Sequence, residues 1–533
     1  MAGSLAVMAG AAAEALPALQ RAVALEPDLD EAWHYLGEAL QAGQRWAEAA
    51  QAYRRAMASR PEEVFNIALC AERAGEWEHA RQGYQAMCRL RPDRVDCAVR
   101  LAQSEAMCCR FDDEATLLAA LSGRLASGAP MAPGDVPEAF PLSYLPLADK
   151  DKGMLLDRYA ARIVQRAQAL GGPLPWTPAV PGPRRRIGYL SADFGEHPVG
   201  DLVRGLFAAH DRAAVEVHAY SLHKHEDAVA MEIRAGVEHF HDCEALSTLQ
   251  IAQLIRSHGI ELLIDLSGYT AGGRPEILAL RPAPRQLGWL GFIHGQQAPW
   301  LDGILLDENV LPADAPWPYA DHVLRLPAPL LPAGPITGQI PTGKPDRQRF
   351  GLPHGRVVLA SFNSSYKLEA ALTAAWAEIL RRAPGAVLLV YLPGHARQGF
   401  LVTWRACGGD EARLILADWL PPDEQADRAA SCDLFLDAFR YQAGATAIAS
   451  VAAGLPILSR EGDTPLARLS VSLNRFLGLD ELVCADTETY VARAAGLAND
   501  PSSLVTLRQR LIAAATRQQL FDPRRMAAAI EKL

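Results

Sequence analysis

Two patterns of hydrophobic positions divide the chain. In the first part, apolar and small residues recur with the spacing of helix-turn-helix repeats. From Arg186 onward, short apolar runs alternate with helix-like stretches. That alternation is typical of parallel, doubly wound sheets, which bind ligands at the carboxyl ends of their strands. The chain is therefore predicted to be α plus α/β, with a helical region followed by Rossmann-like domains.

The helical region carries a recognisable repeat. Pro27 and Pro61 are 34 residues apart, which is the length of a tetratricopeptide unit. Such repeats present a groove to other polypeptides. Residues 1–121 are therefore predicted to form a tetratricopeptide α-solenoid that docks a protein or peptide, and a helical array without a partner is the alternative. The positions that define the best-preserved unit are Trp33, Leu36, Gly37, Leu40, Ala49, Tyr53, Ala56 and Pro61.

The α/β region divides into two halves, 184–330 and 345–515, joined by a proline-rich crossing over 326–345. No G-x-G-x-x-G follows the first strand and no P-loop motif occurs, which argues against a dinucleotide oxidoreductase and a P-loop kinase. The predicted strands are 186–191, 215–221, 262–265, 286–291 and 303–306 in the first half, and 357–362, 386–392, 413–416, 434–437 and 456–458 in the second.

Residues 122–183 contain proline- and glycine-rich pieces that punctuate rather than continue a helix. Between these pieces, 150–169 has helical spacing. We therefore expect a linker with one docking helix here. A C-terminal helix is expected over 516–533.

Composition narrows the function classes. The chain has 533 residues, 50% of them hydrophobic, and a net charge of −10, which argues against a broad nucleic-acid surface. The nine cysteines form no C-x-x-C, so neither a zinc site nor a disulfide framework is indicated. The N-terminal run lacks the early basic residue of a secretory signal, and no apolar stretch is long enough to span a bilayer. A cytoplasmic protein without a membrane or nucleic-acid partner is expected.

Two loops that follow predicted strands carry candidate chemistry. Lys367 lies at the carboxyl end of strand 357–362, where a ligand would lie. The turn 442–446 opens a helix, so its amide groups could hold a phosphate through the helix dipole. After the first strand, His197 precedes Pro198 at the entrance of a helix, where it could donate to a phosphate or approach an acceptor hydroxyl. An ordinary surface lysine, a simple turn and a capping histidine are the alternatives. His223 and His225 lack a convincing ligand spacing and are expected to be solvated.

Five segments of the chain form a distinctive set: GYLSADFGEHP, GYTAGGRPEILALRPAPRQLGWLGF, SFNSSYKL, CDLFLDAFRYQAGAT and ARLSVSLNRFLGLDELV. Together they resemble the protein O-GlcNAc transferase family, particularly its bacterial members. The resemblance implies tetratricopeptide repeats on a two-domain GT-B core, a UDP-sugar donor as co-substrate with no cofactor, Ser/Thr acceptors, and inversion at the anomeric carbon without a metal.

The resemblance also assigns individual positions. It implies that Lys367 contacts the donor diphosphate and that His197 is the active-site histidine. At other donor-site positions the family residue is replaced. Ser364 lies where the family has a glutamine, and Gln425 lies where it has a histidine. Gly444, Ala445 and Thr446 replace His-Thr-Thr, and Ala449 replaces an aspartate that binds the ribose. By the same resemblance, Leu420, Pro421 and Pro422 occupy the turn that contacts uracil and ribose, whose backbone could still read a base edge. Arg428 is retained, and Tyr366 belongs to the S-Y-K triplet that ends at Lys367. In the sugar pocket, His294, Gly295, Gln296 and Gln297 replace a Gly-Thr-Ser-Gly turn.

Because of these replacements, three functions remain as alternatives. The first is transfer of a sugar, expected to be GlcNAc, from UDP to Ser/Thr hydroxyls of proteins. The second is transfer from another nucleotide sugar or to another acceptor. The third is a weakly active or non-catalytic tetratricopeptide scaffold. An exposed cation in a degenerate cleft has no packing role, so the presence of both His197 and Lys367 favours an enzyme.

Overall fold

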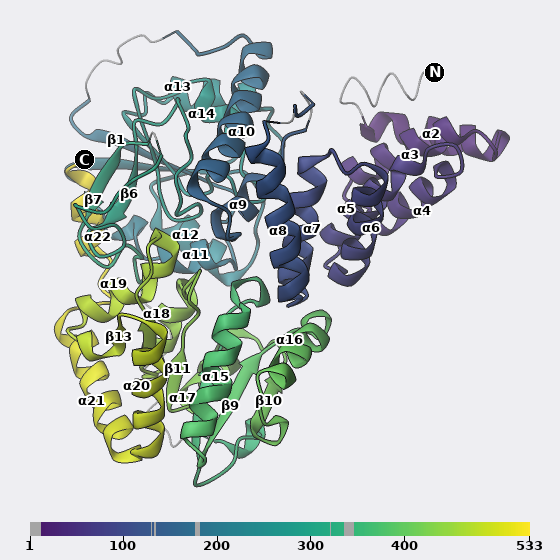
Figure 1. The fold of residues 1–533 in the computed structure, drawn as a ribbon. Coiled ribbons are helices and arrows are strands. Elements are labelled where there is room, and N and C mark those ends of the chain that lie inside the picture. Colours follow the sequence, from purple (N-terminus) through teal and green to yellow (C-terminus); the bar gives the residue numbers. More distant parts are fainter. Residues whose placement is uncertain (1–11, 129, 133–134, 176–181, 320, 335–345) are drawn as a thin grey trace. The chain divides into compact units, whose positions relative to one another are not determined.

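The computed structural model describes residues 12–128, 130–132, 135–175, 182–319, 321–334 and 346–533 (Figure 1). The first eleven residues, part of the proline-rich piece before 183, and 335–345 of the predicted crossing lie outside the described residues. Contacts group the chain into two compact units: Met1–Pro141 with Gly394–Leu401, and Leu142–Pro393 with Val402–Leu533. These units do not follow the five segments expected from the sequence, and that division stays a prediction.

The first unit consists of stacked helix pairs, as the repeat spacing predicts. Consecutive helices pack against one another along the chain. The last helix continues five residues beyond the predicted end of the repeats at 121. The helices are α2 (Ala12–Leu25), α3 (Asp30–Ala42), α4 (Trp46–Ala56), α5 (Val64–Arg73), α6 (Trp77–Leu90), α7 (Val95–Met107) and α8 (Phe111–Ala126).

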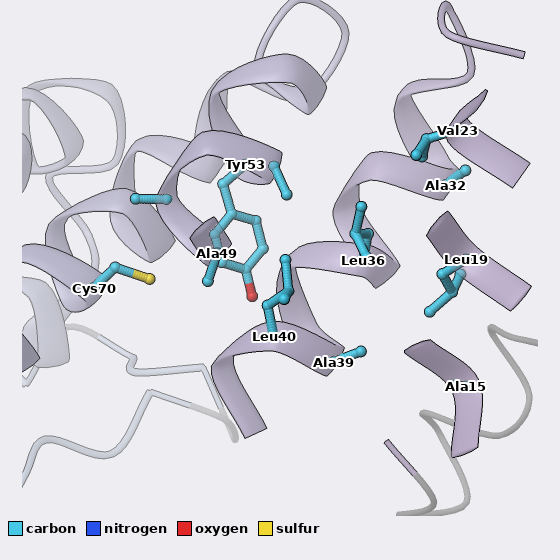
Figure 2. Packing of buried hydrophobic residues seen from close by; sticks show 12 residues of the cluster. Ala15, Leu19, Val23, Ala32, Leu36, Ala39, Leu40, Ala49, Tyr53 and Cys70 are labelled. Carbon is cyan, nitrogen blue, oxygen red and sulfur yellow. The ribbon is translucent and has the colours of Figure 1, made fainter. Parts of the chain in front are cut away.

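Tyr53 shows why the repeat pattern folds in this way. Its ring is fully buried and lies among Ala49, Leu40 and Cys70 (Figure 2). A Cβ atom added to Gly37 would lie 2.6 Å from this ring, so only glycine lets α3 approach α4 this closely. Tyr84 occupies the equivalent position in α6, is also fully buried, and donates a 2.5 Å hydrogen bond to Glu72.

The second unit begins with a helix that packs on the first α/β half. Helix α9 (Ala139–Tyr144) leads into α10 (Asp149–Ala169), which agrees with the helix predicted over 150–169. Helix α10 contacts α14 (Glu276–Ala279), and Arg166 pairs with Glu276 at 3.0 Å. The rings of Tyr159 and Tyr269 meet at 4.8 Å.

The first sheet has seven parallel strands in the order β3-β2-β1-β4-β5-β6-β7. All five predicted strands are present. The sequence pattern missed β3, which reads HFHD and has no apolar run, and β7, which adjoins the proline-rich crossing. The strands are β1 (Arg185–Ser191), β2 (Val215–Ser221), β3 (His239–Asp242), β4 (Leu262–Asp265), β5 (Arg285–Gly288), β6 (Gly303–Asp307) and β7 (Val323–Leu326); the other helices are α11 (Pro198–Val203), α12 (Ala228–Gly236) and α13 (Thr248–Ser257).

The second sheet has six parallel strands in the order β10-β9-β8-β11-β12-β13. All five predicted strands are again present, and only the two-residue β13 was missed. The strands are β8 (Val357–Ser361), β9 (Ala386–Tyr391), β10 (Leu414–Ala417), β11 (Leu434–Leu436), β12 (Ile457–Arg460) and β13 (Val483–Cys484); the helices are α15 (Ala370–Arg382), α16 (Gly394–Ala406), α17 (Pro422–Ala430), α18 (Ala445–Ala452), α19 (Leu469–Phe476), α20 (Thr487–Asn499) and α21 (Pro501–Arg517).

The end of the chain returns to the first sheet. The C-terminal helix expected over 516–533 is shorter in the structure: α21 ends at Arg517, and helix α22 covers Arg524–Glu531. Helix α22 contacts β7. The Glu531 carboxylate lies 2.8 Å from Nδ1 of His210, and the Glu531 carbonyl accepts a bond from Arg185 at 3.2 Å.

No helix in the described part of the chain combines the length and the apolar character that crossing a bilayer requires.

Candidate functional site

The carboxyl edge of the second sheet brings two predicted loops together. Strands β8 and β11 are hydrogen-bonded neighbours, so the loop 362–367 and the loop 437–444 leave the sheet side by side. The first loop ends in a 3-10 turn, Ser365–Lys367, and the second leads directly into α18. The sequence placed candidate chemistry on both loops, and the sheet topology makes them adjacent.

Lys367 is buried, so it is neither an ordinary surface lysine nor the exposed cation expected from the sequence. Its side chain is 8% exposed, and its ammonium donates a 3.1 Å hydrogen bond to the Gln442 carbonyl. The ammonium also lies 3.8 Å from the centre of the Tyr441 ring. Burial lowers the pKa of Lys367 to about 8, against the opposing attraction of Asp437. A buried cation beside a helix start is a strong candidate for binding an anion.

A polar network fixes the loop that holds Lys367. The buried Asp437 carboxylate accepts bonds from the Ala443 amide at 3.0 Å, from Asn363 at 2.9 Å and from the Ser470 hydroxyl at 2.5 Å. The Gln442 side chain accepts a 3.0 Å bond from the Ser470 amide. The carbonyl that receives the Lys367 ammonium is therefore held in place, which is the preorganisation that charge stabilisation requires.

Helix α18 offers its first turn at the same edge. Gly444 is the N-cap, and Ala445 and Thr446 begin the helix, where backbone N–H groups have no partner within the helix. Ala449 lies one turn after Ala445 on the same helix face and is exposed. An aspartate at 449 would have room at this surface.

The predicted base-contacting turn follows β10, one strand beyond β9. Leu420 is partly buried, while Pro421 and Pro422 are exposed at the start of α17. Arg428 is buried and donates to the Asp418 carbonyl at 2.8 Å and to Gln425 at 3.0 Å. Arg428 thus stabilises the turn through hydrogen bonds on its buried side.

Two aromatic side chains stand at this part of the site. Tyr366 contacts the rings of Tyr144 at 4.7 Å and Tyr441 at 5.9 Å, so the candidate loop packs on the segment that precedes α10. Trp419, next to Leu420, is 68% exposed. Ser364 is the N-cap of the 3-10 turn, and its carbonyl accepts a 3.0 Å bond from the Lys367 amide.

Lys152 on α10 was missed by sequence reasoning. It is 5% exposed, and burial lowers its pKa to about 8, with Asp149 opposing and Arg440 adding to the effect. Arg440 belongs to the loop that leads to α18 and donates to the Leu368 carbonyl at 2.7 Å. A second buried cation therefore lies near the Lys367 loops. The sequence gave no indication that Lys152 would be buried near these loops, because it lies within an amphipathic helix.

The residues predicted for the sugar pocket are packed inside the first half. The Nε2 atom of His294 lies 2.7 Å from the Tyr319 hydroxyl, and burial lowers the pKa of His294 to about 3. A Cβ atom on Gly295 would lie 2.1 Å from the Tyr319 ring, so the turn needs glycine there. The Gln296 amide donates a 2.8 Å bond to Asp321, and the Gln296 side chain fills the space over Gly288.

His197 caps α11 at the carboxyl edge of the first sheet. Its Nδ1 atom accepts a 3.2 Å bond from the Val199 amide and lies 3.7 Å from the Asp193 carboxylate. Because Nδ1 accepts this bond, the neutral ring carries its proton on Nε2 and presents a donor. The structure therefore fits His197 as a donor to a ligand better than as a general base.

Asp193 is the centre of a group that the sequence did not reveal. Burial raises its pKa, while His197, His225 and His223 lower it. Among the described residues, its Oδ2 atom is buried and has no hydrogen-bond partner. The expectation that His223 and His225 are solvated is wrong: both are partly buried, and His225 lies 2.8 Å from the Ala192 carbonyl.

The two candidate groups belong to helices that touch. Helix α11, capped by His197, packs against α18, capped by Gly444. The halves are also joined by Ser472, which donates a 2.7 Å bond to Asp307, and by Arg468, which donates a 2.8 Å bond to the Asn309 carbonyl. The candidate site thus combines the edge of one sheet that carries Lys367 and the start of α18 with the His197–Asp193 pair at the edge of the other.

The family model described as Glycosyl transferase family 41 matches residues 139–330 and 340–530. A probable UDP-N-acetylglucosamine–peptide N-acetylglucosaminyltransferase SEC of Arabidopsis thaliana is 31% identical over 356 residues, which is 66% of this chain and 36% of that protein. The corresponding Caenorhabditis elegans enzyme is 24% identical over 465 residues, 66% of this chain and 40% of that protein. The matches thus span well under half the length of these relatives.

Among solved structures, a mutant of the Thermobaculum terrenum O-GlcNAc transferase aligns with a TM-score of 0.73 and 25% identity, covering 100% of this chain and 96% of that one. The predicted fold class is confirmed: stacked helix pairs are followed by two Rossmann-like sheets in a GT-B-like fold. The resemblance drawn from the five sequence segments is confirmed as well.

Proposed function

The chain belongs to glycosyl transferase family 41, and on this premise we propose that it transfers a sugar, expected to be GlcNAc, from a UDP-sugar to serine or threonine hydroxyls of proteins. The proposed reaction inverts the anomeric carbon and uses no metal. The observation that carries the proposal is the buried Lys367 ammonium at the carboxyl edge of the second sheet, beside the first turn of α18.

The donor diphosphate is proposed to lie against Lys367 and the first-turn amides of α18. When the bond from the sugar to the diphosphate breaks, negative charge grows on the leaving oxygen. A fixed ammonium and aligned N–H groups stabilise that charge more strongly at a buried site than in water. Lys152 and Arg440 add positive charge near the same loops. The base is proposed to lie by 420–422, with Trp419 as an available aromatic surface.

The acceptor hydroxyl is proposed to approach from the side of the first sheet. Its oxygen attacks the anomeric carbon, and its proton is proposed to pass to the Asp193 carboxylate, whose Oδ1 atom lies 3.7 Å from Nδ1 of His197. His197 then donates from Nε2 to the donor or the acceptor. Inversion follows if attack and departure occur on opposite faces of the sugar.

A donor screen tests this function. Calorimetry with UDP, UDP-GlcNAc and other UDP- and GDP-sugars should show binding of uridine nucleotides, and a ligand-bound structure should place the nucleotide near Lys367, 420–428 and 444–446. Binding of guanosine nucleotides alone would favour the second candidate, a transferase for another nucleotide sugar, which the replaced residues Ala445, Ala449 and Gln296 motivate. Binding of neither class would support the scaffold.

The pH dependence of UDP binding follows from the lowered lysine pKa values. Lys367 and Lys152 each have a pKa of about 8, and a diphosphate favours their charged forms. The terminal phosphate of UDP has its second pKa at about 6, so UDP affinity should be constant only between about pH 7 and 8. Above pH 8 it should fall by up to about tenfold per pH unit for each lysine that must be protonated. Binding near pH 8.5 should take up protons, which calorimetry in buffers of different ionisation enthalpy measures.

Lys367→Arg is the matched variant, because its side chain stays charged throughout this range. Proton uptake should drop by at least half in this variant. Equal uptake in the variant and the wild type would show that Lys367 does not contact the nucleotide.

Restoring the replaced ribose contact should strengthen UDP binding. Ala449 cannot accept hydrogen bonds from ribose hydroxyls, and it lies exposed one turn after Ala445. The double substitution Ala449→Asp with Ala445→Thr should raise UDP affinity by about ten- to one-hundredfold, the worth of one charge-assisted hydrogen bond. Calorimetry measures the change.

Ala449→Asn with Ala445→Thr is the neutral control and should gain less. If the folded aspartate variant gains nothing, ribose recognition in this chain has been rebuilt around other residues.

The acceptor is proposed to be a protein or peptide, in keeping with the repeats of the first unit. Asn66 is the one obvious asparagine in that array, and its side-chain amide donates a 2.7 Å bond to Glu63. An asparagine ladder for peptide backbone, as in animal members of the family, is therefore not expected. The repeats are proposed to dock a folded partner instead. The test compares pull-down of a folded acceptor protein with binding of the same sequences as unfolded peptides on an array.

A further inference from the structure

Four histidines gather at one edge of the first sheet. In β2, Glu216, His218 and Tyr220 alternate with apolar residues and so share one face. In β3, His239 and His241 share a face in the same way. The register pairs His218 with His239 and Tyr220 with His241, so these side chains stand together on one face of the sheet. His258 joins them from the end of α13.

The nitrogen atoms of three of these histidines converge. Nδ1 of His218 lies 3.1 Å from Nε2 of His241. One ligand nitrogen from each of His218, His241 and His258 lies within 4.8 Å of the other two. Two imidazole nitrogens bound to one tetrahedral zinc ion, with bonds of about 2.0–2.1 Å, are separated by about 3.3 Å. The observed separations thus suit a shared ion after small side-chain rotations.

Hydrogen bonds to one ring nitrogen of His218 and of His258 leave the other ring nitrogen facing the cluster. Nε2 of His218 lies 2.9 Å from the Glu216 carboxylate and donates a hydrogen bond to it. The other ring nitrogen, Nδ1, then carries no proton and faces His241. Nδ1 of His258 lies 2.9 Å from the Tyr220 hydroxyl, which leaves Nε2 for an ion. Carboxylate–histidine–metal arrangements of this kind orient the ring and increase its basicity.

The groups that face this cluster from β2 and β3 are Glu216, Tyr220 and His239. The Glu216 carboxylate lies 2.9 Å from Nε2 of His218 and 3.3 Å from Nε2 of His239. A second carboxylate, that of Glu238, lies 3.7 Å from Nε2 of His239.

The position of the cluster indicates a structural role. β3 is a four-residue edge strand without an apolar run. Its one large apolar side chain, Phe240, contacts Phe194 and Arg234. His258 precedes the amino end of β4, whereas Asp193 follows the carboxyl end of β1 and Asp265 is the last residue of β4. The cluster therefore lies apart from the candidate catalytic edge, and the proposed sugar transfer does not use it.

We propose that His218, His241 and His258 bind one divalent transition-metal ion, with zinc as the ion in the cell, and that this ion ties β3 to the end of α13. Sequence spacing gave no such indication, because the ligands come from three elements and form no short motif. The fourth ligand position would be filled by water or by His239, which shares Glu216 with His218.

The test uses the full chain after treatment with EDTA and dialysis. Calorimetry with zinc chloride should show one tightly bound ion per chain, and addition of cobalt(II) should produce the visible d–d absorption of a tetrahedral site. His241→Ala and His258→Ala should each weaken zinc binding by at least tenfold. His79→Ala, which removes a 73% exposed histidine on α6, is the matched control and should bind zinc as the wild type does.

Tyr220→Phe covers the case in which an alanine variant fails to fold. Loss of this second-sphere contact should weaken zinc binding by about ten- to one-hundredfold. The proposal is overturned if the wild-type chain takes up no zinc and gives no cobalt spectrum, or if zinc affinity is unchanged in the folded His241→Ala and His258→Ala variants. Either result would make the cluster a packing arrangement of stacked rings.

Discussion

Lys367→Ala is expected to lower turnover by at least about 10²-fold while the fold remains intact. The substitution removes the buried ammonium that donates to the Gln442 carbonyl and is proposed to meet the leaving diphosphate. Loss of one preorganised electrostatic contact costs about two to three powers of ten in rate. The measurement is sugar transfer to a protein acceptor at saturating donor, with thermal unfolding to verify the fold.

Two controls separate charge from packing. Lys367→Met keeps most of the side-chain volume in the buried site, so it should lose turnover as Lys367→Ala does but unfold at a temperature closer to that of the wild type. Lys532→Ala removes an exposed lysine at the end of α22 and should leave turnover unchanged. Near-normal transfer by a correctly folded Lys367→Met variant would rule out the proposed role.

Asp193→Asn is expected to lower turnover by about 10²- to 10⁴-fold, the usual contribution of a positioned general base. Asparagine keeps the shape of the side chain beside His197, 3.7 Å away in the wild type, but cannot take up the acceptor proton. UDP affinity should be unchanged, because the nucleotide is proposed to bind to the other sheet. Turnover and calorimetry on the same preparation measure both quantities.

The pH–rate profile should show the loss of this general base. A general base works in its deprotonated form, and burial raises the pKa of Asp193 above its ordinary value. The wild-type rate should therefore decline as the pH falls through that raised pKa, at a higher pH than an exposed aspartate would give. The residual activity of Asp193→Asn should lack this acidic decline. A variant with the wild-type profile and rate would assign the proton transfer to another group, such as the donor phosphate.

The active-site chemistry was only partly visible in the sequence. Lys367 could be singled out because it follows a strand at the edge where ligands bind. Its burial, its contact with Tyr441 and the lowered pKa depend on loops 75 residues apart in the chain. Lys152 could not be found, because nothing in a helix sequence indicates which face will lie beside Arg440.

Local patterns alone determined the fold class, the repeat and ten of the strands, because helix period, strand alternation and buried apolar runs are written in consecutive residues. The family could be identified for the same reason, since its motifs are short segments. The tertiary structure alone decided the rest: β3 forms because β2 offers it an edge, α22 returns to the first sheet through Glu531, and the three converging histidines come from separate elements. Such features depend on long-range contacts, which no local pattern encodes.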